Sequence, residues 1–515
     1  MTAVAVVSIS PIAAEAGARV ADRGGNAADA AVAATLVSAI SAPGMCSLGG
    51  AGFALVAPPD GDPEAIDGGF EMPGRGLPRG DLGGGRIDAH LEYAGGVDTT
   101  VGPGSVATPG APALCGLVAE RHGLLDWADL VEPAIEVASR GFPLPPAARD
   151  YLVFAHEEIF GWNEDSHAAL HDRSGRLLAA GATVRIAHLE TSLRLIAKEG
   201  PGVFYDGSLG AAIADYVRGE GGALGRADLA AYRPTVRPPM RTTHGAWDVL
   251  TNPAPAVGGV VLAAMLGLLD GRAPSGGRWT ESWAARLATA QAAVLEFRRT
   301  ELDAADELEL AAARLLRAVE SGTLRLVDAP STVHTSAVDS DGLACAITLS
   351  DGYGSGAMAP GTGIWLNNAL GEPELNPHGF HGWPVGHRLV SNMAPTVARQ
   401  RGGPVLAIGS PGADRITTAL VQVLTNHLDF GMTLQAAVDH PRLHVELVGG
   451  DRRVALEPGL PSEALPFPTR PFDAASMFFG GVAAVSHDPT VGFRTGIDAR
   501  RGCGAAIGGA PSDVS

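Results

Sequence analysis

Cysteine is scarce in this sequence: only four of its 515 residues are cysteines, and they lie far apart. No two of them have the CxxC spacing of zinc ligands, and their positions do not form the regular framework of a disulfide-rich domain. The cysteines therefore predict neither a metal site nor a disulfide scaffold. They are Cys46, Cys115, Cys345 and Cys503.

Positive charge is also scarce. Lys198 is the only lysine, and 37 basic residues stand against 56 acidic ones, which gives a formal net charge of −19. Nucleic acids and anionic membranes bind basic surfaces, so this balance argues against both classes of partner. We expect no nucleic-acid partner and no membrane partner.

The first residues lack the features of an export signal. The stretch from Met1 to Gly17 is apolar, but no lysine or arginine precedes its hydrophobic part, as a secretory signal requires. We therefore expect a cytoplasmic protein. The hydrophobic content of 46% and the 69 glycines are typical of a large packed core with many tight turns.

The most informative segment runs from Pro330 to Ala337 and is followed by a glycine-rich run at 352–356. Alternating β-branched and small apolar residues on both sides of an Asp-Gly pair predict two strands joined by a tight turn. Thr332 falls at the start of the first strand. On local pattern alone this is an ordinary hairpin, because threonine favours strands.

A threonine at this position can also serve as a nucleophile. Its hydroxyl reacts poorly unless a base is held against it. If the peptide bond between Ser331 and Thr332 were cut, Thr332 would gain an α-amino group with an ordinary pKa of roughly 7.7 to 8.0. Such an amine titrates near neutral pH and can accept the hydroxyl proton. One residue would then supply both nucleophile and base.

Hydrophobic periodicity predicts helices and strands in an order typical of a layered α/β fold. Helices are expected over 11–40, over 111–140 with breaks, over 281–320 and from about Ile416 to Leu428, and a buried strand over 48–57.

Several short motifs support the nucleophile interpretation, because they occur in a fixed order along nearly the whole chain. They lie at 24–33, 48–53, 107–110, 204–207, 228–232, 253–259, 362–368, 391–396 and 409–416. With the Thr-x-His-x-Ser pattern of residues 332–336, this ordered set resembles the γ-glutamyltransferase (γ-glutamyltranspeptidase) family of N-terminal-nucleophile hydrolases. The resemblance implies an αββα sandwich, in which two stacked sheets lie between helical layers.

The resemblance also implies roles for individual residues. Thr332 corresponds to the catalytic threonine, and Ser350 to a hydroxyl that orients it. Gly412 and Ala413 correspond to a Gly-Gly pair whose backbone N–H groups hold the oxyanion. His334 is expected to be structural or involved in self-cleavage. The family needs no organic cofactor and no catalytic metal, so neither is expected here.

The family's γ-glutamyl pocket is altered in this sequence. Phe70 stands where the family has an arginine that clamps the substrate α-carboxylate, and that bidentate contact is strong and geometry-specific. Arg75 lies nearby in sequence, but nothing in the sequence orients it. The family's acidic partner of the α-amino group corresponds loosely to Glu372, and its paired serines become Ser391 and Asn392.

Self-cleavage at Ser331–Thr332 would give two products, 1–331 and 332–515, which we expect to remain associated as one folded unit. Residues 321–331 are expected to form an exposed linker. A late His-Pro-Arg-Leu-His motif and residues 498–501 also resemble family motifs. We expect its two histidines, His440 and His444, to be helix-end or packing residues rather than metal ligands.

The predicted chemistry is acyl transfer from a small-molecule acyl substrate other than glutathione, through an acyl-enzyme at Thr332, to water or an amine. The bond broken could be an amide of a small acyl group, as in oxamate-type amidohydrolases. It could also be a carbon–carbon bond that holds an oxalyl-type group to a proline-derived precursor, as in lincomycin-type and pyrrolobenzodiazepine antibiotic pathways. Ordinary γ-glutamyl transfer, or a non-catalytic scaffold with the same fold, would also be compatible with the resemblance.

Overall fold

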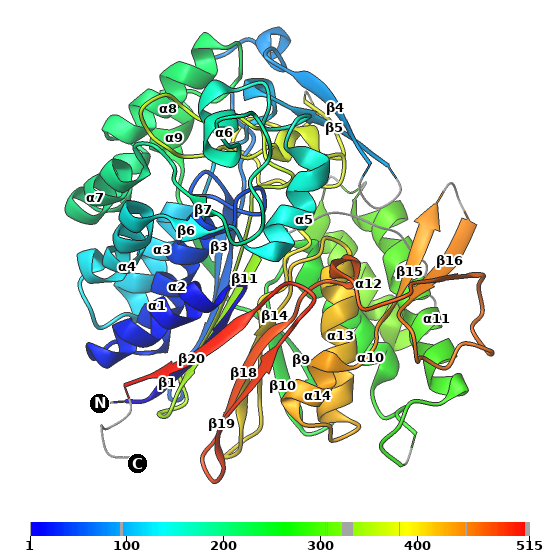
Figure 1. Cartoon of the computed structure of the whole chain (residues 1–515). Coiled ribbons are helices and arrows are strands. Elements are labelled where there is room, and N and C mark those ends of the chain that lie inside the picture. The colour runs from blue at the N-terminus through cyan, green and yellow to red at the C-terminus, as the bar shows by residue number, and fades with distance from the viewer. Residues whose placement is uncertain are drawn as a thin grey trace.

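Two antiparallel sheets stacked face to face form the centre of the computed structural model, and helices cover both outer faces (Figure 1). The structure describes residues 2–92, 96–274, 276–303, 305, 307–321, 333–380, 382–448 and 451–509.

The first sheet has seven strands in the order β20-β1-β11-β12-β2-β3-β8. Every neighbouring pair in it is antiparallel. The hairpin predicted around the Asp-Gly pair is its centre, and Gly342 in the turn has a positive φ of 92°. The strands are β1 (Val4–Ser8), β2 (Ala51–Ala57), β3 (Glu64–Gly68), β8 (Thr235–Arg237), β11 (Val333–Asp339), β12 (Ala344–Ser350) and β20 (Gly504–Gly508).

The second sheet has six strands in the order β19-β18-β14-β13-β10-β9. Its inner face packs on the first sheet through a core of small and β-branched side chains. Strand alternation separates the two faces of β11, since Ala337 packs toward the helices and Val338 toward the second sheet. The strands are β9 (Met240–His244), β10 (Trp247–Thr251), β13 (Thr396–Arg399), β14 (Val405–Gly409), β18 (Ala483–Asp488) and β19 (Gly492–Ile497).

The helix that covers β11 and β12 begins at a capping box. The Asn26 side chain accepts hydrogen bonds from the N–H groups of Ala28 and Asp29, and the Asp29 carboxylate accepts one from the Asn26 N–H. Every residue of this alanine-rich helix is buried, because its small side chains allow close approach to the sheet. The helices on this side are α1 (Pro11–Asp22), α2 (Ala27–Ser41), α3 (Ala111–His122) and α4 (Trp127–Arg140).

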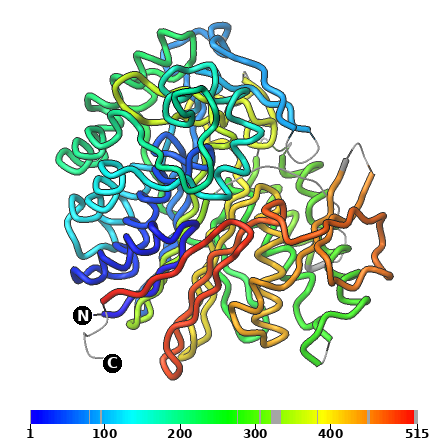
Figure 2. Tube along the Cα trace, viewed as in Figure 1, coloured from blue at the N-terminus to red at the C-terminus, as the bar shows by residue number. Residues whose placement is uncertain are grey.

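The second sheet is covered by helices from the middle and the end of the chain, which lie together in Figures 1 and 2. These are α10 (Val257–Leu269), α11 (Glu281–Phe297), α12 (Leu308–Ser321), α13 (Arg415–Leu428) and α14 (Leu434–Asp439). The three-stranded sheet of β15 (Leu443–Val448), β16 (Asp451–Leu456) and β17 (Thr469–Pro471) extends beside them.

The remaining elements lie mostly above the first sheet in the view of Figure 1. They are the strand pair β4 (Ile87–Leu91) and β5 (Val97–Val101), the pair β6 (Phe142–Pro143) and β7 (Thr183–Val184), and the helices α5 (Pro146–Ala155), α6 (Glu164–Leu170), α7 (Leu189–Glu199), α8 (Ser208–Gly219) and α9 (Arg226–Ala231). Among the described residues, no helix has the length and apolar character needed to cross a membrane.

One predicted element is wrong in its continuity. The single helix expected over 281–320 is two α-helices separated by a π-helical segment, Arg298–Leu302. Arg298 is buried, and its Nε lies 3.1 Å from the Asp303 carboxylate. The change in winding accompanies the burial of this ion pair, which hydrophobic periodicity does not report. The helix expected over 11–40 is likewise two, since residues 23–26 separate α1 from α2.

Candidate active site

Ser331 and Thr332, the predicted cleavage site, lie outside the described residues, as does most of the predicted linker. The first residue described after them is Val333, the first residue of β11. The surroundings of the candidate site are therefore the ends of the strands nearest to Val333.

His334 joins the two sheets. Its ring lies between Thr348, whose Oγ1 is 2.7 Å from Nδ1, and Ser336, whose Oγ is 2.8 Å from Nε2. The Ser336 hydroxyl also donates to the Ala483 carbonyl of the second sheet. Burial lowers the pKa of His334 to about 3, so its imidazole is neutral. A Cβ at Gly409 would approach the ring within 2.2 Å, and these contacts give His334 a structural role.

Ser350 is the last residue of β12 and is buried. Val333 pairs with Leu349, so Ser350 lies one residue past that pair, at the end of the hairpin nearest the predicted cleavage site. Its Oγ accepts a hydrogen bond from the Gly352 N–H at 3.0 Å. This bond fixes the rotamer of the hydroxyl predicted to orient the nucleophile.

Gly412 and Ala413 form a tight turn that leads into α13. Both have positive φ, 128° and 68°, and Ala413 is one of two non-glycine residues with this conformation among the described ones. Their carbonyls accept from the N–H groups of Arg415 and Ile416, whereas their own N–H groups have no protein partner among the described residues. Two unpaired N–H groups at the N-terminus of a helix can hold an oxyanion.

Phe70 follows β3 and is buried, with 3% of its surface exposed. The backbone beside it is clamped, because the Gly69 carbonyl accepts from the Tyr232 hydroxyl at 2.8 Å and from Arg388 Nη1 at 2.9 Å. Arg388 also lies 3.1 Å from the Glu71 carboxylate. Arg388 was not predicted from the sequence as a site residue, since only the fold brings it beside Phe70.

Arg75, which nothing in the sequence orients, is oriented in the structure by two carboxylates. Its guanidinium lies 3.4 Å from Glu71 and 3.5 Å from Asp228. Its backbone N–H also donates to Asp228 at 2.9 Å. Both arginines near Phe70 therefore lie within ion-pair distance of protein carboxylates, although Arg75 Nη1 makes no hydrogen bond to a described residue.

Glu372 is fully buried in the loop beside the glycine-rich run. One carboxyl oxygen accepts from the Tyr353 N–H at 2.6 Å, and the other has no partner among the described residues. Burial raises the pKa of this carboxyl well above its ordinary value, with a further contribution from Glu374. A Cβ at Gly352 would collide with the Glu372 carboxyl, so only glycine fits there.

Ser391 and Asn392 are buried close to this loop. The connection runs through the backbone, because the Val390 N–H donates to Leu375 and the Leu375 N–H donates to Glu372. Ser391 Oγ accepts weakly from the Met393 N–H at 3.3 Å. Both polar atoms of the Asn392 amide are buried without a partner in the described part of the chain, which is uncommon in a folded protein.

Comparison with known proteins identifies the family. The sequence profile described as gamma-glutamyltranspeptidase matches residues 13–508. The chain belongs to the gamma-glutamyltranspeptidase family. It is 30% identical over 468 residues to the acylase ACY 1 proenzyme of Pseudomonas sp. strain V22. This match covers 86% of this chain and 82% of that protein.

Two further comparisons agree. The chain is 28% identical over 485 residues to the glutathione hydrolase proenzyme of Escherichia coli K12, with 87% of this chain and 82% of that protein covered. The cephalosporin acylase from Bacillus halodurans superposes with a TM-score of 0.80 at 25% identity, over 98% of this chain and 96% of that one. These findings confirm the αββα sandwich and an enzyme of the N-terminal-nucleophile hydrolase class.

Two further buried residues of this gamma-glutamyltranspeptidase-family site were not selected from the sequence as site residues. Asn368 Oδ1 accepts from the N–H groups of Tyr353 and Gly354, which shapes the glycine-rich run. Asp351 has one carboxyl oxygen without a hydrogen bond to any described residue, and burial raises its pKa to about 7. In the sequence, only the Asn-Asn motif pointed to Asn368, and only the position directly after Ser350 pointed to Asp351. No group of three potential metal ligands occurs among the described residues.

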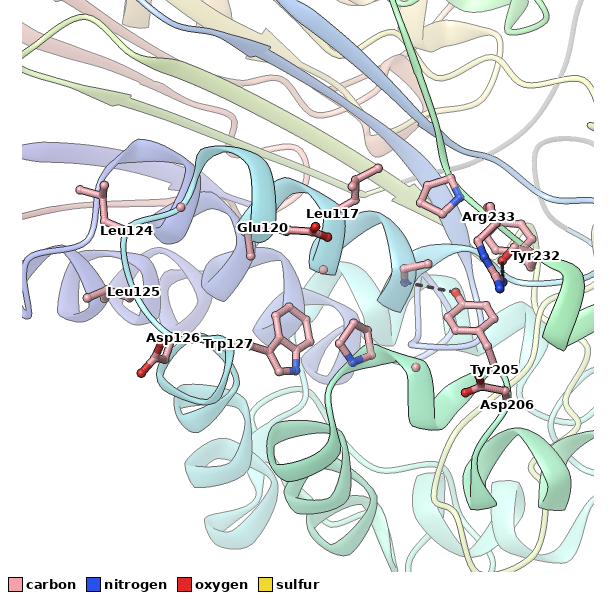
Figure 3. A pocket seen from close by; sticks show the side chains of 17 residues that line it. Leu117, Glu120, Leu124, Leu125, Asp126, Trp127, Tyr205, Asp206, Tyr232 and Arg233 are labelled. Atoms are coloured by element: carbon pink, nitrogen blue, oxygen red, sulfur yellow. Dashed lines mark hydrogen bonds between the residues drawn. The ribbon is translucent and has the colours of Figure 1, made fainter.

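A surface cavity of about 750 Å³ lies between α3, the start of α4 and the short helix Pro201–Phe204 (Figure 3). Trp127, Tyr205 and Glu120 line it. Tyr232, whose hydroxyl bonds to Gly69, also borders it, so the cavity lies behind the Phe70 segment.

Proposed function

We propose that this member of the gamma-glutamyltranspeptidase family is a self-processing N-terminal-threonine hydrolase or acyltransferase that acts on an acyl group other than γ-glutamyl. Thr332 Oγ attacks the acyl carbonyl while the Thr332 α-amine takes the hydroxyl proton and passes it to the leaving group. Water or an amine then releases the acyl group from Thr332.

The turn at Gly412 and Ala413 supports the acyl-transfer step. Its two N–H groups, unpaired within the described residues, can stabilise the charge that develops on the carbonyl oxygen of a tetrahedral intermediate. Ser350, with its hydroxyl fixed at the end of the hairpin, is the orienting group of the proposal.

The environment of Phe70 is the observation that carries the proposed specificity. A γ-glutamyl group presents an α-carboxylate, which calls for a fixed cation. Phe70 presents an apolar ring, and the nearby Arg75 and Arg388 are held by Glu71 and its neighbours. A substrate carboxylate there would have to compete with Glu71 for these guanidinium groups. The proposed acyl substrate therefore carries no α-carboxylate at this position.

Buried polar atoms without partners among the described residues indicate what the acyl group offers instead. The proposed substrate-binding residues are Phe70, Glu372, Ser391 and Asn392. A neutral Glu372 carboxyl can donate a hydrogen bond, and the Asn392 amide can both donate and accept. Uncharged polar groups, such as a carboxamide or a keto group, suit these side chains. The similarity to proteins named acylases favours an amide as the bond broken.

Cleavage would give the products 1–331 and 332–515, and the fold supports their continued association. β11 pairs with β1, β12 pairs with β2, and β10 pairs with β13, so each sheet contains strands from both products. Separating them would disrupt both sheets.

Intact mass spectrometry of the purified wild type beside Thr332→Ala tests the nucleophile. We expect two fragments in the wild type, with Thr332 at the new N-terminus, and one intact chain in the variant. Thr243→Ala, at an exposed threonine of β9, is the matched control and should be cleaved like the wild type. One intact chain in all three proteins would contradict self-processing.

A substrate screen on the processed protein tests the specificity. Turnover of small neutral acyl anilides, compared with glutathione and γ-glutamyl-p-nitroanilide, should favour the neutral acyl groups. Release of an oxalyl-type group from a conjugated proline derivative, with no amide turnover, would select carbon–carbon cleavage instead. Efficient turnover of glutathione would sink the specificity proposal.

A further inference from the structure

We infer that His444 is a positioning residue that holds the oxyanion turn, residues 410–415, in its reactive conformation through Asp414. The catalytic part of this inference rests on the proposed function, whereas the positioning of the turn by His444 does not. His444 comes from the His-Pro-Arg-Leu-His motif and was expected to be a helix-end or packing residue. It is not at a helix end, because it lies in β15, whereas His440 follows α14 directly.

Asp414 is the residue after Ala413 and is buried with its carboxylate between two basic side chains. One oxygen lies 2.7 Å from Arg415 Nη1, and the other lies 2.9 Å from His444 Nε2. Burial alone would raise the pKa of Asp414, but Arg415 and His444 together hold it below the ordinary value. Asp414 is therefore a buried anion whose position depends on its partners.

The second ring nitrogen of His444 prevents the imidazole from following the turn if it moves. Nδ1 lies 3.1 Å from Thr418 Oγ1, one turn further along α13. The ring also packs edge-on against Phe478 at a centroid distance of 6.0 Å. His444 thus connects the residue after the oxyanion N–H groups to the body of the helix.

The opposite side of the turn is held by the segment 476–482. Gly481 N–H donates to Ser410 Oγ at 3.1 Å, and Ser410 Oγ donates to the Pro411 carbonyl. A Cβ at Gly412 would lie 2.8 Å from Gly480 Cα, so the two backbones are in close contact. The turn cannot relax in this direction.

The segment 476–482 is itself held by three buried charged side chains. Glu457 accepts from the Ser476 N–H, Arg442 donates to the Phe479 carbonyl, and Asp498 accepts from the Val482 N–H. Arg442 and Asp498 pair with each other at 2.6 Å. Motif residues 442, 444 and 498 therefore surround one turn, and His444 is the member that contacts it through Asp414.

This arrangement has a mechanical consequence. Ala413 has a left-handed φ of 68°, a conformation in which the alanine Cβ crowds the following carbonyl oxygen. Without the His444 contact the turn can relax, and the N–H groups of Gly412 and Ala413 lose their common direction. Because oxyanion donors act only when correctly placed, a small shift lowers the acylation rate without weakening ground-state binding.

The experiment compares His444→Asn with His444→Gln on the processed protein. Gln can place its amide near Nε2 and reach Asp414, whereas Asn reaches only toward Thr418. With p-nitrophenyl acetate as the acylating probe, we expect the acylation rate to fall about 10- to 100-fold in His444→Asn at unchanged KM, and to recover largely in His444→Gln. Phenylboronic acid, which forms a tetrahedral adduct, should bind His444→Asn more weakly than the wild type, and most of its affinity should return in His444→Gln.

Hydrogen exchange of the peptide that contains residues 410–416 gives a readout that needs no catalysis. Exchange should be faster in His444→Asn than in the wild type and near normal in His444→Gln. His440→Asn, four residues earlier in the same motif, is the matched control and should leave acylation and exchange unchanged. If His444→Asn does not fold, Thr418→Val takes its place; it removes the Nδ1 contact together with the hydrogen bond from Thr418 Oγ1 to the Arg415 carbonyl.

The outcomes separate the inference from the proposed function. If wild type and Thr332→Ala release p-nitrophenolate equally, the proposed nucleophile fails, and exchange alone decides the role of His444. If exchange and acylation in His444→Asn match the wild type, the inference is overturned. Equal losses in the Asn and Gln variants would also overturn it, because they would report general destabilisation.

Discussion

The two sides of the candidate active site differ in how their buried polar groups are paired. On the side of the oxyanion turn, Asp414 lies between Arg415 and His444, and Arg442 pairs with Asp498. On the side of the acyl pocket, one carboxyl oxygen of Glu372 and both amide atoms of Asn392 are buried without a partner among the residues that the structure describes.

In our proposal, this difference separates a framework side from a side that binds the ligand. Buried charges in opposite-sign pairs restrain backbone, because moving either partner leaves the other uncompensated. Buried polar atoms without partners are costly unless something else supplies the hydrogen bonds. The buried charges of the oxyanion side are thus paired within the protein, although Asp414 Oδ2 and Arg442 Nε make no hydrogen bond to a described residue, and the acyl side is completed by substrate in our proposal.

The largest expected effect comes from breaking the paired side. Asp498→Asn keeps an acceptor for the Val482 N–H but removes the counter-charge of the buried Arg442. We expect the free energy of unfolding to fall by about 3 to 5 kcal/mol, measured by denaturant titration in the unprocessed Thr332→Ala chain. Asp451→Asn, at an exposed carboxylate that begins β16, should change it little. A loss below about 1 kcal/mol would show that the Arg442–Asp498 pair does not hold the folded structure together.

The next effect tests whether His334, between the sheets, is neutral. Burial lowers its pKa from 6.5 to about 3, so the unfolded chain binds more protons between these values. Its contribution to stability is present above pH 6.5 and is lost as pH falls toward 3. We expect the unprocessed Thr332→Ala chain to lose about 2 kcal/mol more than the same chain with His334→Gln between pH 7 and pH 5, measured by denaturant titration at each pH. Parallel pH profiles would mean that the imidazole is not held neutral.

A smaller effect tests whether the oxyanion turn is strained at Ala413 and still functional. Ala413→Gly removes the steric penalty of a φ of 68° and keeps the backbone N–H. We expect stability to rise by about 1 kcal/mol and acylation to change less than a few-fold. Ala407→Gly in the buried strand β14 is the control, and there the same substitution should destabilise. Destabilisation in both would place the turn outside the left-handed region.

Local sequence patterns predict much of the framework. The hairpin of β11 and β12 follows from alternation around an Asp-Gly turn, and the helix near 416 follows from its periodicity. The break after α11 does not follow from hydrophobic periodicity, because it accompanies the burial of a charged side chain, Arg298, which pairs with Asp303 five residues later.

The candidate site was less accessible to sequence reasoning where its contacts join distant segments. Arg388 reaches the Gly69 carbonyl across 319 residues of chain, and His444 on β15 meets Asp414 at the start of α13. The motifs that contain these residues were visible, but their partners depend on strand register and on the stacking of two sheets. Alternation within one strand carries no information about either.

The smallest expected effect tests the unpaired side. Burial raises the pKa of Glu372 well above its ordinary value, which favours the protonated carboxyl, and Glu372→Gln keeps an oxygen that can accept from the Tyr353 N–H. We expect the free energy of unfolding to change by less than about 1 kcal/mol, measured in the same unprocessed chain as Asp498→Asn. A stabilisation of several kcal/mol would instead mean that Glu372 is a buried, unpaired charge. The acyl side would then differ from the oxyanion side in unpaired charge rather than in unpaired neutral hydrogen-bonding groups. Its missing partner would be a cationic acyl group.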